Sequence, residues 1–148
     1  MKHIAFDSGA VASHTYPMLA IAAEVARRGH RVSFATTARF APEVAAAGVR
    51  PVVPRIPVST QSPARDFFEI PLRLLDGAIA ALPSIEQAYA DDPPDIVLSE
   101  DATSASRILA AKHAIPSVPV WPFFPGRQHW THAYGREHPQ VAALLDKL

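Results

Sequence analysis

Residues 3–35, HIAFDSGAVASHTYPMLAIAAEVARRGHRVSFA, contain the unit from which the fold can be predicted. The short apolar run His3–Phe6 predicts a buried strand that ends in the turn Asp7-Ser8-Gly9. Pro17 suits the first turn of a helix, where its missing N–H group costs nothing. Apolar residues at helical spacing follow, Gly29 provides a left-handed cap, and the alternating residues after it predict a second strand. The stretch therefore reads as a strand–helix–strand unit.

The same alternation continues along the chain. The further elements expected are a helix over 40–47, a strand over 49–53, a helix from Pro71 that Pro83 should kink or split, a strand over 95–99, a helix over 103–113, a strand over 117–121 and a helix over 139–148. Strands that alternate with helices require right-handed crossovers and a parallel sheet covered on both faces. We expect a single Rossmann-like α/β domain over residues 1–148, an open doubly wound parallel sheet of about five strands. Pro119 cannot donate to a strand ladder, which predicts an edge position for the last strand.

Composition excludes several classes of protein. With 148 residues, 49% hydrophobic and 19% charged, the chain can bury one core and is not expected to be disordered. Its 14 basic and 14 acidic residues balance without a basic run, which argues against nucleic acid or a membrane surface as partner. The absence of cysteine excludes disulfides and thiol nucleophiles, and no apolar run approaches the ~20 residues of a membrane span. A cytoplasmic protein without a signal peptide is expected.

The loop after the first strand is the first candidate site, because ligands of doubly wound sheets bind at the carboxyl ends of the strands. This loop, residues 7–17 (DSGAVASHTYP), has one glycine and so matches neither GxGxxG nor GxxxxGK. We expect it to present His14 just before a helix N-terminus. Because histidine titrates near neutral pH, His14 could act as a general base. The alternative is a loop histidine that hydrogen-bonds to the backbone.

Carboxylates at two strand ends are candidates to orient that histidine. The fourth strand ends at Glu100 and Asp101, and in a parallel sheet the first and fourth strands are often neighbours across the switch in strand order. One of the two acids could then fix the tautomer of His14. Either could equally be a helix N-cap. Asp7, at the end of the first strand, is a third candidate, either functional or simply solvated at the rim.

An aromatic segment follows the fifth strand, where an apolar ligand could bind. Its candidate ligand-contacting residues are Trp121, Phe123, Phe124 and Trp130. A core plug or a subunit contact is the alternative. The nearby His129, His132 and His138 lack an HExxH pattern or supporting carboxylates, so no metal site is expected. No G-x-S-x-G motif is present, which excludes an α/β-hydrolase.

Two blocks, residues 3–52 and 76–120, resemble the N-terminal, acceptor-binding domain of bacterial macrolide-type glycosyltransferases of the GT-B UDP-glycosyltransferase family. The combination of His-x-x-Pro at 14–17 with RRGHRVSFAT at 27–36 is specific, and the resemblance covers most of residues 3–121. It implies that His14 is the base that deprotonates the acceptor hydroxyl in an inverting transfer.

The same resemblance assigns further residues, with departures. An aspartate usually orients the base, whereas this chain has Glu100 at that position, with Asp101 one residue later. Ser13 replaces the usual glycine before the histidine, and Asp7 replaces a residue that is usually neutral. Ser13 and the segment from Trp121 are implied to contact a hydrophobic acceptor such as a polyketide.

The family also has a second Rossmann-like domain for the nucleotide sugar, and residues 1–148 are not expected to include it. No cofactor is therefore expected on this chain alone, and a nucleotide sugar would bind only through a missing or partner domain. Three hypotheses follow. In the first, the chain is the acceptor-binding half of a glycosyltransferase that needs a donor-domain protein. In the second, it performs acid–base chemistry, a cyclisation or isomerisation, on a hydrophobic natural product without a nucleotide sugar. In the third, it is a non-catalytic binding or partner-stabilising protein, such as a homodimer.

Overall fold

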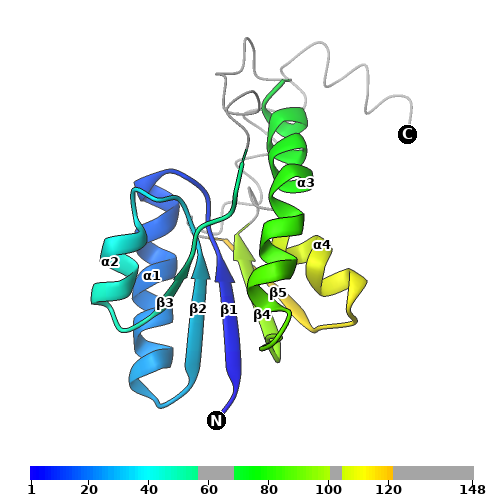
Figure 1. Cartoon of the computed structure of the whole chain (residues 1–148). Coiled ribbons are helices and arrows are strands. Elements are labelled where there is room, and N and C mark those ends of the chain that lie inside the picture. Colours follow the sequence, from blue (N-terminus) through cyan, green and yellow to red (C-terminus); the bar gives the residue numbers. More distant parts are fainter. Residues whose placement is uncertain (57–68, 101–104, 122–148) are drawn as a thin grey trace, which may run out of the picture.

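The computed structural model describes residues 1–56, 69–100 and 105–121, and the statements below concern these ranges. The elements in chain order are β1 (His3–Asp7), α1 (Ala12–Arg27), β2 (Arg31–Ala35), α2 (Ala41–Ala46), β3 (Arg50–Val52), α3 (Glu69–Tyr89), β4 (Ile96–Glu100), α4 (Ala105–Lys112) and β5 (Ser117–Val120) (Figure 1). The strands form one sheet in the order β3-β2-β1-β4-β5, and every neighbouring pair is parallel. The predicted α/β, doubly wound parallel sheet of five strands is therefore confirmed.

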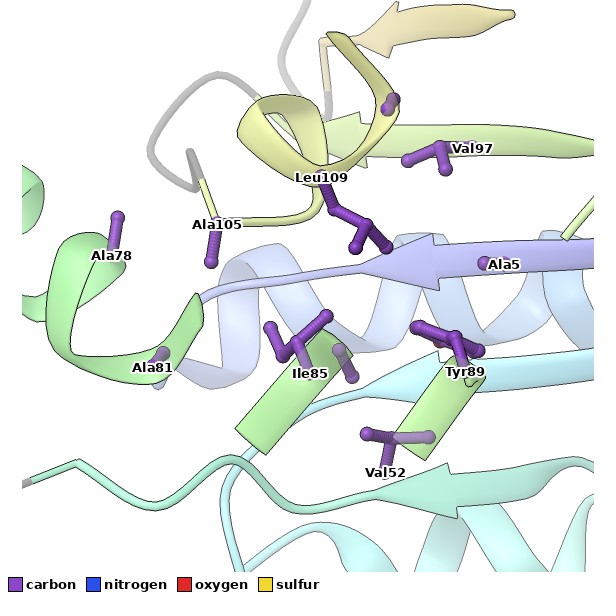
Figure 2. Packing of buried hydrophobic residues seen from close by; sticks show 11 residues of the cluster. Ala5, Val52, Ala78, Ala81, Ile85, Tyr89, Val97, Ala105 and Leu109 are labelled. Atoms are coloured by element: carbon purple, nitrogen blue, oxygen red, sulfur yellow. The ribbon is translucent and has the colours of Figure 1, made fainter. Parts of the chain in front are cut away.

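Two apolar clusters hold helices against the two faces of the sheet. Alternate residues of β1 supply them: Ala5 packs with α3 and α4, and Phe6 packs with α1 and α2. Figure 2 shows the first cluster, in which Tyr89 of α3 lies over β2 and Leu109 of α4 lies beside β1. Both faces of the central strands are thus buried, as is usual for parallel strands connected by helices. The same alternation sends Asp7 towards α3 and α4, and sends Glu100 towards α1.

The β1–α1 junction differs from the sequence prediction. Helix α1 begins at Ala12, because Val11 is extended and its carbonyl accepts the N–H groups of His14 (3.1 Å) and Thr15 (3.0 Å). Pro17 accordingly lies inside the helix and not in its first turn. The expectation that His14 precedes the helix N-terminus was wrong, since His14 belongs to the first turn of α1.

Helix α3 also departs from expectation, because it runs unbroken past Pro83. Pro83 is exposed, so the carbonyl of Ile79 that loses its helical donor can turn to water. On the opposite face, Ala81, Ile85 and Tyr89 pack into the core. This packing on both sides of the proline holds the helix together, and the predicted split was wrong.

Strand β5 lies at the edge of the sheet, as Pro119 predicted. The N–H of Val97 donates to the carbonyl of Pro116 (2.9 Å), so in a parallel ladder Pro119 faces away from β4. Its missing N–H therefore removes a donor only from the outer edge. No helix among the described residues is long and apolar enough to cross a membrane.

Candidate acid–base site at the ends of strands β1 and β4

Glu100 is the central acid of the candidate site. It is the last residue of β4, and its side chain is fully buried although it carries a carboxylate. Its Oε2 contacts Nδ1 of His14, and its Oε1 accepts the N–H of Gly9 at 2.7 Å. A buried carboxylate needs such partners, because burial of an unpaired charge is strongly unfavourable. The pairing of β1 with β4 brings these three groups together.

Local sequence in the β1–α1 loop shapes the space that Glu100 occupies. A Cβ atom at Gly9 would lie 2.6 Å from Oε1 of Glu100, so a side chain there would displace the carboxylate. Thr15 is buried, and its Oγ1 lies within hydrogen-bonding distance of the carbonyls of Gly9 (3.0 Å) and Val11 (3.1 Å). These bonds hold the loop against the first turn of α1, which is the part of the chain that carries His14.

His14 has a chemically useful orientation. Its side chain is 17% exposed, whereas the carboxylate that it contacts is wholly buried. An ionised carboxylate can only accept hydrogen bonds, so Nδ1 of His14 must carry the proton and Nε2 the lone pair. A carboxylate on the far side of the ring also stabilises the imidazolium that forms when Nε2 takes up a proton. The arrangement can therefore act as a general base.

Asp7 lies beside this pair on the opposite face of the sheet. It is 5% exposed, and its Oδ2 accepts the N–H of Ser106 in the first turn of α4 (3.1 Å). Burial raises the pKa of Asp7 to about 6; hydrogen bonds from Ser106 oppose the rise and the Glu100 carboxylate adds to it. The prediction that Asp7 could be solvated at the rim was wrong, because α4 covers it.

Buried hydroxyl groups accompany the two acids. Ser8, Thr36 and Ser99 lie at or just past the carboxyl ends of β1, β2 and β4, and each is at most 5% exposed. Among the described residues, their hydroxyl oxygens have no hydrogen-bond partner. Sequence reasoning identified the strand ends but assigned no role to these hydroxyls. They form a group of buried hydroxyls at the ends of three adjacent strands.

The other predicted site residues are distributed unevenly. Ser13 is exposed in the first turn of α1, next to His14, and Trp121 is 62% exposed directly after β5. Asp101, Phe123, Phe124 and Trp130 lie outside the described residues, as do the three histidines at 129, 132 and 138 and the helix expected over 139–148. Within the described ranges, no group of three or more possible metal-ligating side chains occurs.

An apolar ridge on α3 was missed by sequence reasoning. The first three turns of this helix expose five large apolar side chains: Ile70, Leu72, Leu74, Leu75 and Ile79. In Figure 1 this part of α3 extends past the arrowheads of β1 and β4, so it projects beyond the carboxyl end of the sheet, on the face opposite to α1. A helix with more apolar residues than one buried face requires is the sequence signal that could have revealed it. The ridge gives this end of the molecule an apolar surface.

Comparison with known proteins concerns the fold and the sequence of this chain. No protein-family model matches the chain. It is 37% identical to oleandomycin glycosyltransferase of Streptomyces antibioticus over 125 residues, which are 81% of this chain and 29% of that protein. It is 32% identical to demethyllactenocin mycarosyltransferase of Streptomyces fradiae over 144 residues, which are 88% of this chain and 31% of that protein.

The fold has close counterparts among solved structures. The glycosyltransferase of kitacinnamycin superposes with a TM-score of 0.73 at 28% identity, covering 99% of this chain and 38% of the other. The sheet therefore corresponds to one Rossmann-like domain of the GT-B glycosyltransferases. The chain is homologous to the bacterial macrolide glycosyltransferases, as its sequence motifs indicated, and it spans about a third of the length of the relatives it matches.

Proposed function

We propose that this chain is the acceptor-binding half of an inverting glycosyltransferase that acts on a hydrophobic natural product, with a nucleotide-sugar-binding domain or partner chain completing the enzyme. The single observation that supports this most is the His14–Glu100 pair at the carboxyl ends of β1 and β4. In this pair the acid is buried and the histidine is partly exposed. A general base that is oriented by a carboxylate requires this arrangement, because the base must reach the substrate.

The proposed reaction is a direct displacement. Nε2 of His14 accepts the proton of an acceptor hydroxyl while that oxygen attacks the anomeric carbon of the sugar. The bond from this carbon to the nucleoside diphosphate breaks on the opposite face, so the anomeric configuration inverts. Glu100 stays ionised and stabilises the His14 imidazolium, and the proton then passes to solvent. Stabilising the negative charge that develops on the leaving group is assigned to the donor-binding half.

The acceptor class is inferred from two further observations. The relatives carry the names of oleandomycin, demethyllactenocin and kitacinnamycin, and these names describe those proteins. In this chain, the apolar ridge of α3 and the exposed Trp121 supply apolar surface, while the partly exposed His14 supplies a polar group. An acceptor with a large apolar body and a few hydroxyls fits both kinds of surface.

Acceptor binding can be tested without a donor. Titration of the full chain with macrolide aglycones, followed by calorimetry, should give saturable binding with a negative heat-capacity change from apolar burial. Leu72→Asp and Leu75→Asp on the α3 ridge should each weaken this binding about tenfold. An exposed substitution at the far end of α3, Gln87→Asp, is the matched control and should leave it unchanged.

Transfer is tested by adding the donor-binding half of oleandomycin glycosyltransferase and a nucleotide sugar. His14→Ala should reduce transfer by about 10³-fold, the usual loss for a general base. His113→Ala, at an exposed histidine, is the control. Undiminished transfer by the His14→Ala variant would contradict the base assignment. Conversion of an aglycone in the absence of any nucleotide sugar would instead point to stand-alone acid–base chemistry.

A further inference from the structure

Asp7 connects three parts of the candidate site. It is the last residue of β1 and pairs in register with Ser99, the residue before Glu100. Its backbone leads into Gly9, whose N–H holds one oxygen of Glu100. Its side chain points the other way and holds the N–H of Ser106, in the helix that follows Glu100 in the sequence. Asp7 thus contacts both β4, the strand that carries Glu100, and the first turn of α4.

The geometry limits what Asp7 can do. Its carboxyl group is buried on the α3–α4 side of the sheet, whereas His14 approaches Glu100 from α1. It is therefore poorly placed to meet a substrate at His14. It is well placed to fix the start of α4 against the end of β1, and with it the end of β4 from which Glu100 projects.

We propose that Asp7 is a positioning residue for the His14–Glu100 pair, joining the first turn of α4 to the end of β1 and placing a second ionisable carboxyl beside the pair. This role rests on the proposed function, in which that pair removes the proton from the acceptor. It also accounts for an acidic residue at the end of a buried strand, a position where an apolar or neutral residue would be less costly.

The electrostatic part follows from the groups around Asp7. It faces Glu100 from β4, Tyr89 from α3 and the Ser106 amide from α4. Because charge–charge interactions are mutual, ionisation of Asp7 changes the electrostatic field at the pair. The pKa of Asp7 is raised to about 6, mainly by burial, so this change falls between about pH 5 and 7. Glu100, and through it the ring of His14, should therefore sense the ionisation of Asp7.

The test uses the full chain and nuclear magnetic resonance, so it does not depend on sugar transfer. Hydrogen exchange of the Gly9 amide reports the position of Glu100, and the His14 ring signals report its environment as pH changes. The variants are Asp7→Asn, which keeps an acceptor but cannot ionise, and Asp7→Ala, which removes the acceptor. Asp91→Asn, at an exposed aspartate, is the matched control.

In Asp7→Ala, protection of both the Ser106 and Gly9 amides should fall by about tenfold, the effect of losing one hydrogen bond to a charged group. Asp7→Asn should retain protection at Gly9 but alter the pH dependence of the His14 ring signals between about pH 5 and 7. A folded Asp7→Ala variant with unchanged Gly9 protection would overturn the positioning role. If that variant does not fold, an Asp7→Asn titration that superimposes on the original would overturn the proposal.

The proposed function can fail separately. Suppose that the unmodified chain transfers no sugar with any donor half, while Asp7→Ala still lowers the hydrogen-exchange protection of the Gly9 amide. The positioning role then stands, and the assignment as a transferase half falls. If transfer occurs and depends on His14, but the Asp7 variants change neither the protection of the Gly9 amide nor the His14 ring signals, the proposed function stands and the positioning role falls. With transfer available, Asp7→Asn should also alter the acidic limb of the rate profile, which a purely structural residue would not do.

Discussion

The two ends of the sheet each pair a histidine with an acid, in opposite senses. At the carboxyl end, the acid Glu100 is fully buried and His14 is 17% exposed. At the amino end, the side chain of His3 is only 2% exposed and that of its neighbour Asp92 is 46% exposed. Burying the acid orients a histidine that can still be reached, whereas burying the histidine makes it part of the core.

The amino end contains a buried hydrogen-bond network. Nε2 of His3 pairs with Oγ of Ser33 at 2.9 Å, and this oxygen pairs with the Tyr89 hydroxyl at 3.0 Å. Arg50 lies over the Tyr89 ring, and Arg31 bonds Asp92 at 2.8 Å. Tyr89 and Ser33 are buried, so the network ties α3 to β1 and β2. The amino end therefore contributes to stability, whereas the proposed chemistry lies at the carboxyl end.

The largest expected effect comes from changing the acid at the carboxyl end. Glu100→Gln retains an oxygen for the Gly9 amide but presents an N–H to Nδ1 of His14, which forces the lone pair off Nε2. Transfer in the reconstituted enzyme should fall by roughly 10³–10⁴-fold, as expected when a base is held in the wrong tautomer. Glu86→Gln, on the surface of α3, is the control. A tenfold loss or less would mean that Glu100 does not determine the tautomer.

The second prediction separates the pH dependence of the two ends. The pKa of Asp7 is about 6 in the folded chain against 3.8 in the unfolded chain, so folding takes up protons and stability falls as pH rises from about 4 to 7. The cost at pH 7 is about 3 kcal/mol. Asp7→Asn should flatten this part of the stability curve, measured by urea unfolding at several pH values. A variant with the original slope would show that Asp7 is ionised at little cost.

The third prediction concerns the close approach that shapes the site. Gly9→Ala places a methyl group 2.6 Å from Oε1 of Glu100, so the carboxylate must move or the loop must shift. The expected destabilisation is roughly 2 kcal/mol, with loss of transfer, by the cost of overpacking. Gly77→Ala in α3 is a matched control, because its added Cβ would meet nothing within 4 Å. It should stabilise the chain by about 0.5–1 kcal/mol through helix propensity.

The smallest effect is expected at the amino end. There the stability of the fold should fall as pH decreases, whereas the effect of Asp7 lowers stability as pH rises. Burial lowers the pKa of His3, so the folded chain disfavours the imidazolium. Its contribution to stability is present above the unfolded pKa of 6.5 and is lost as pH falls below it. His3→Asn should remove this acid sensitivity, in thermal unfolding between pH 5 and 7, without changing the pH profile of transfer. A changed transfer profile would contradict the division of roles between the two ends.

Much of the site could be predicted because it depends on topology. Helices between successive strands imply parallel pairing, and the switch in strand order places β1 beside β4. Topology thus brings the β1–α1 loop to the end of β4, and the structure places His14 against Glu100, one of the two acids expected there. The extent of α1 was harder to predict, because the carbonyl of Val11 starts the helix before the proline that was taken as its marker.

The amino-acid sequence by itself determined the class of fold, the order of its elements and the strand ends at which polar residues gather, because these follow from periodicity and from the covalent order of strands and helices. Tertiary structure decided the burial of Asp7, the continuity of α3 past Pro83 and the opposite exposure of the two histidines. Each of these depends on which neighbour covers a side chain, and α4 covers Asp7 from about a hundred residues further along the chain. Local sequence carries no direct record of such a distant contact.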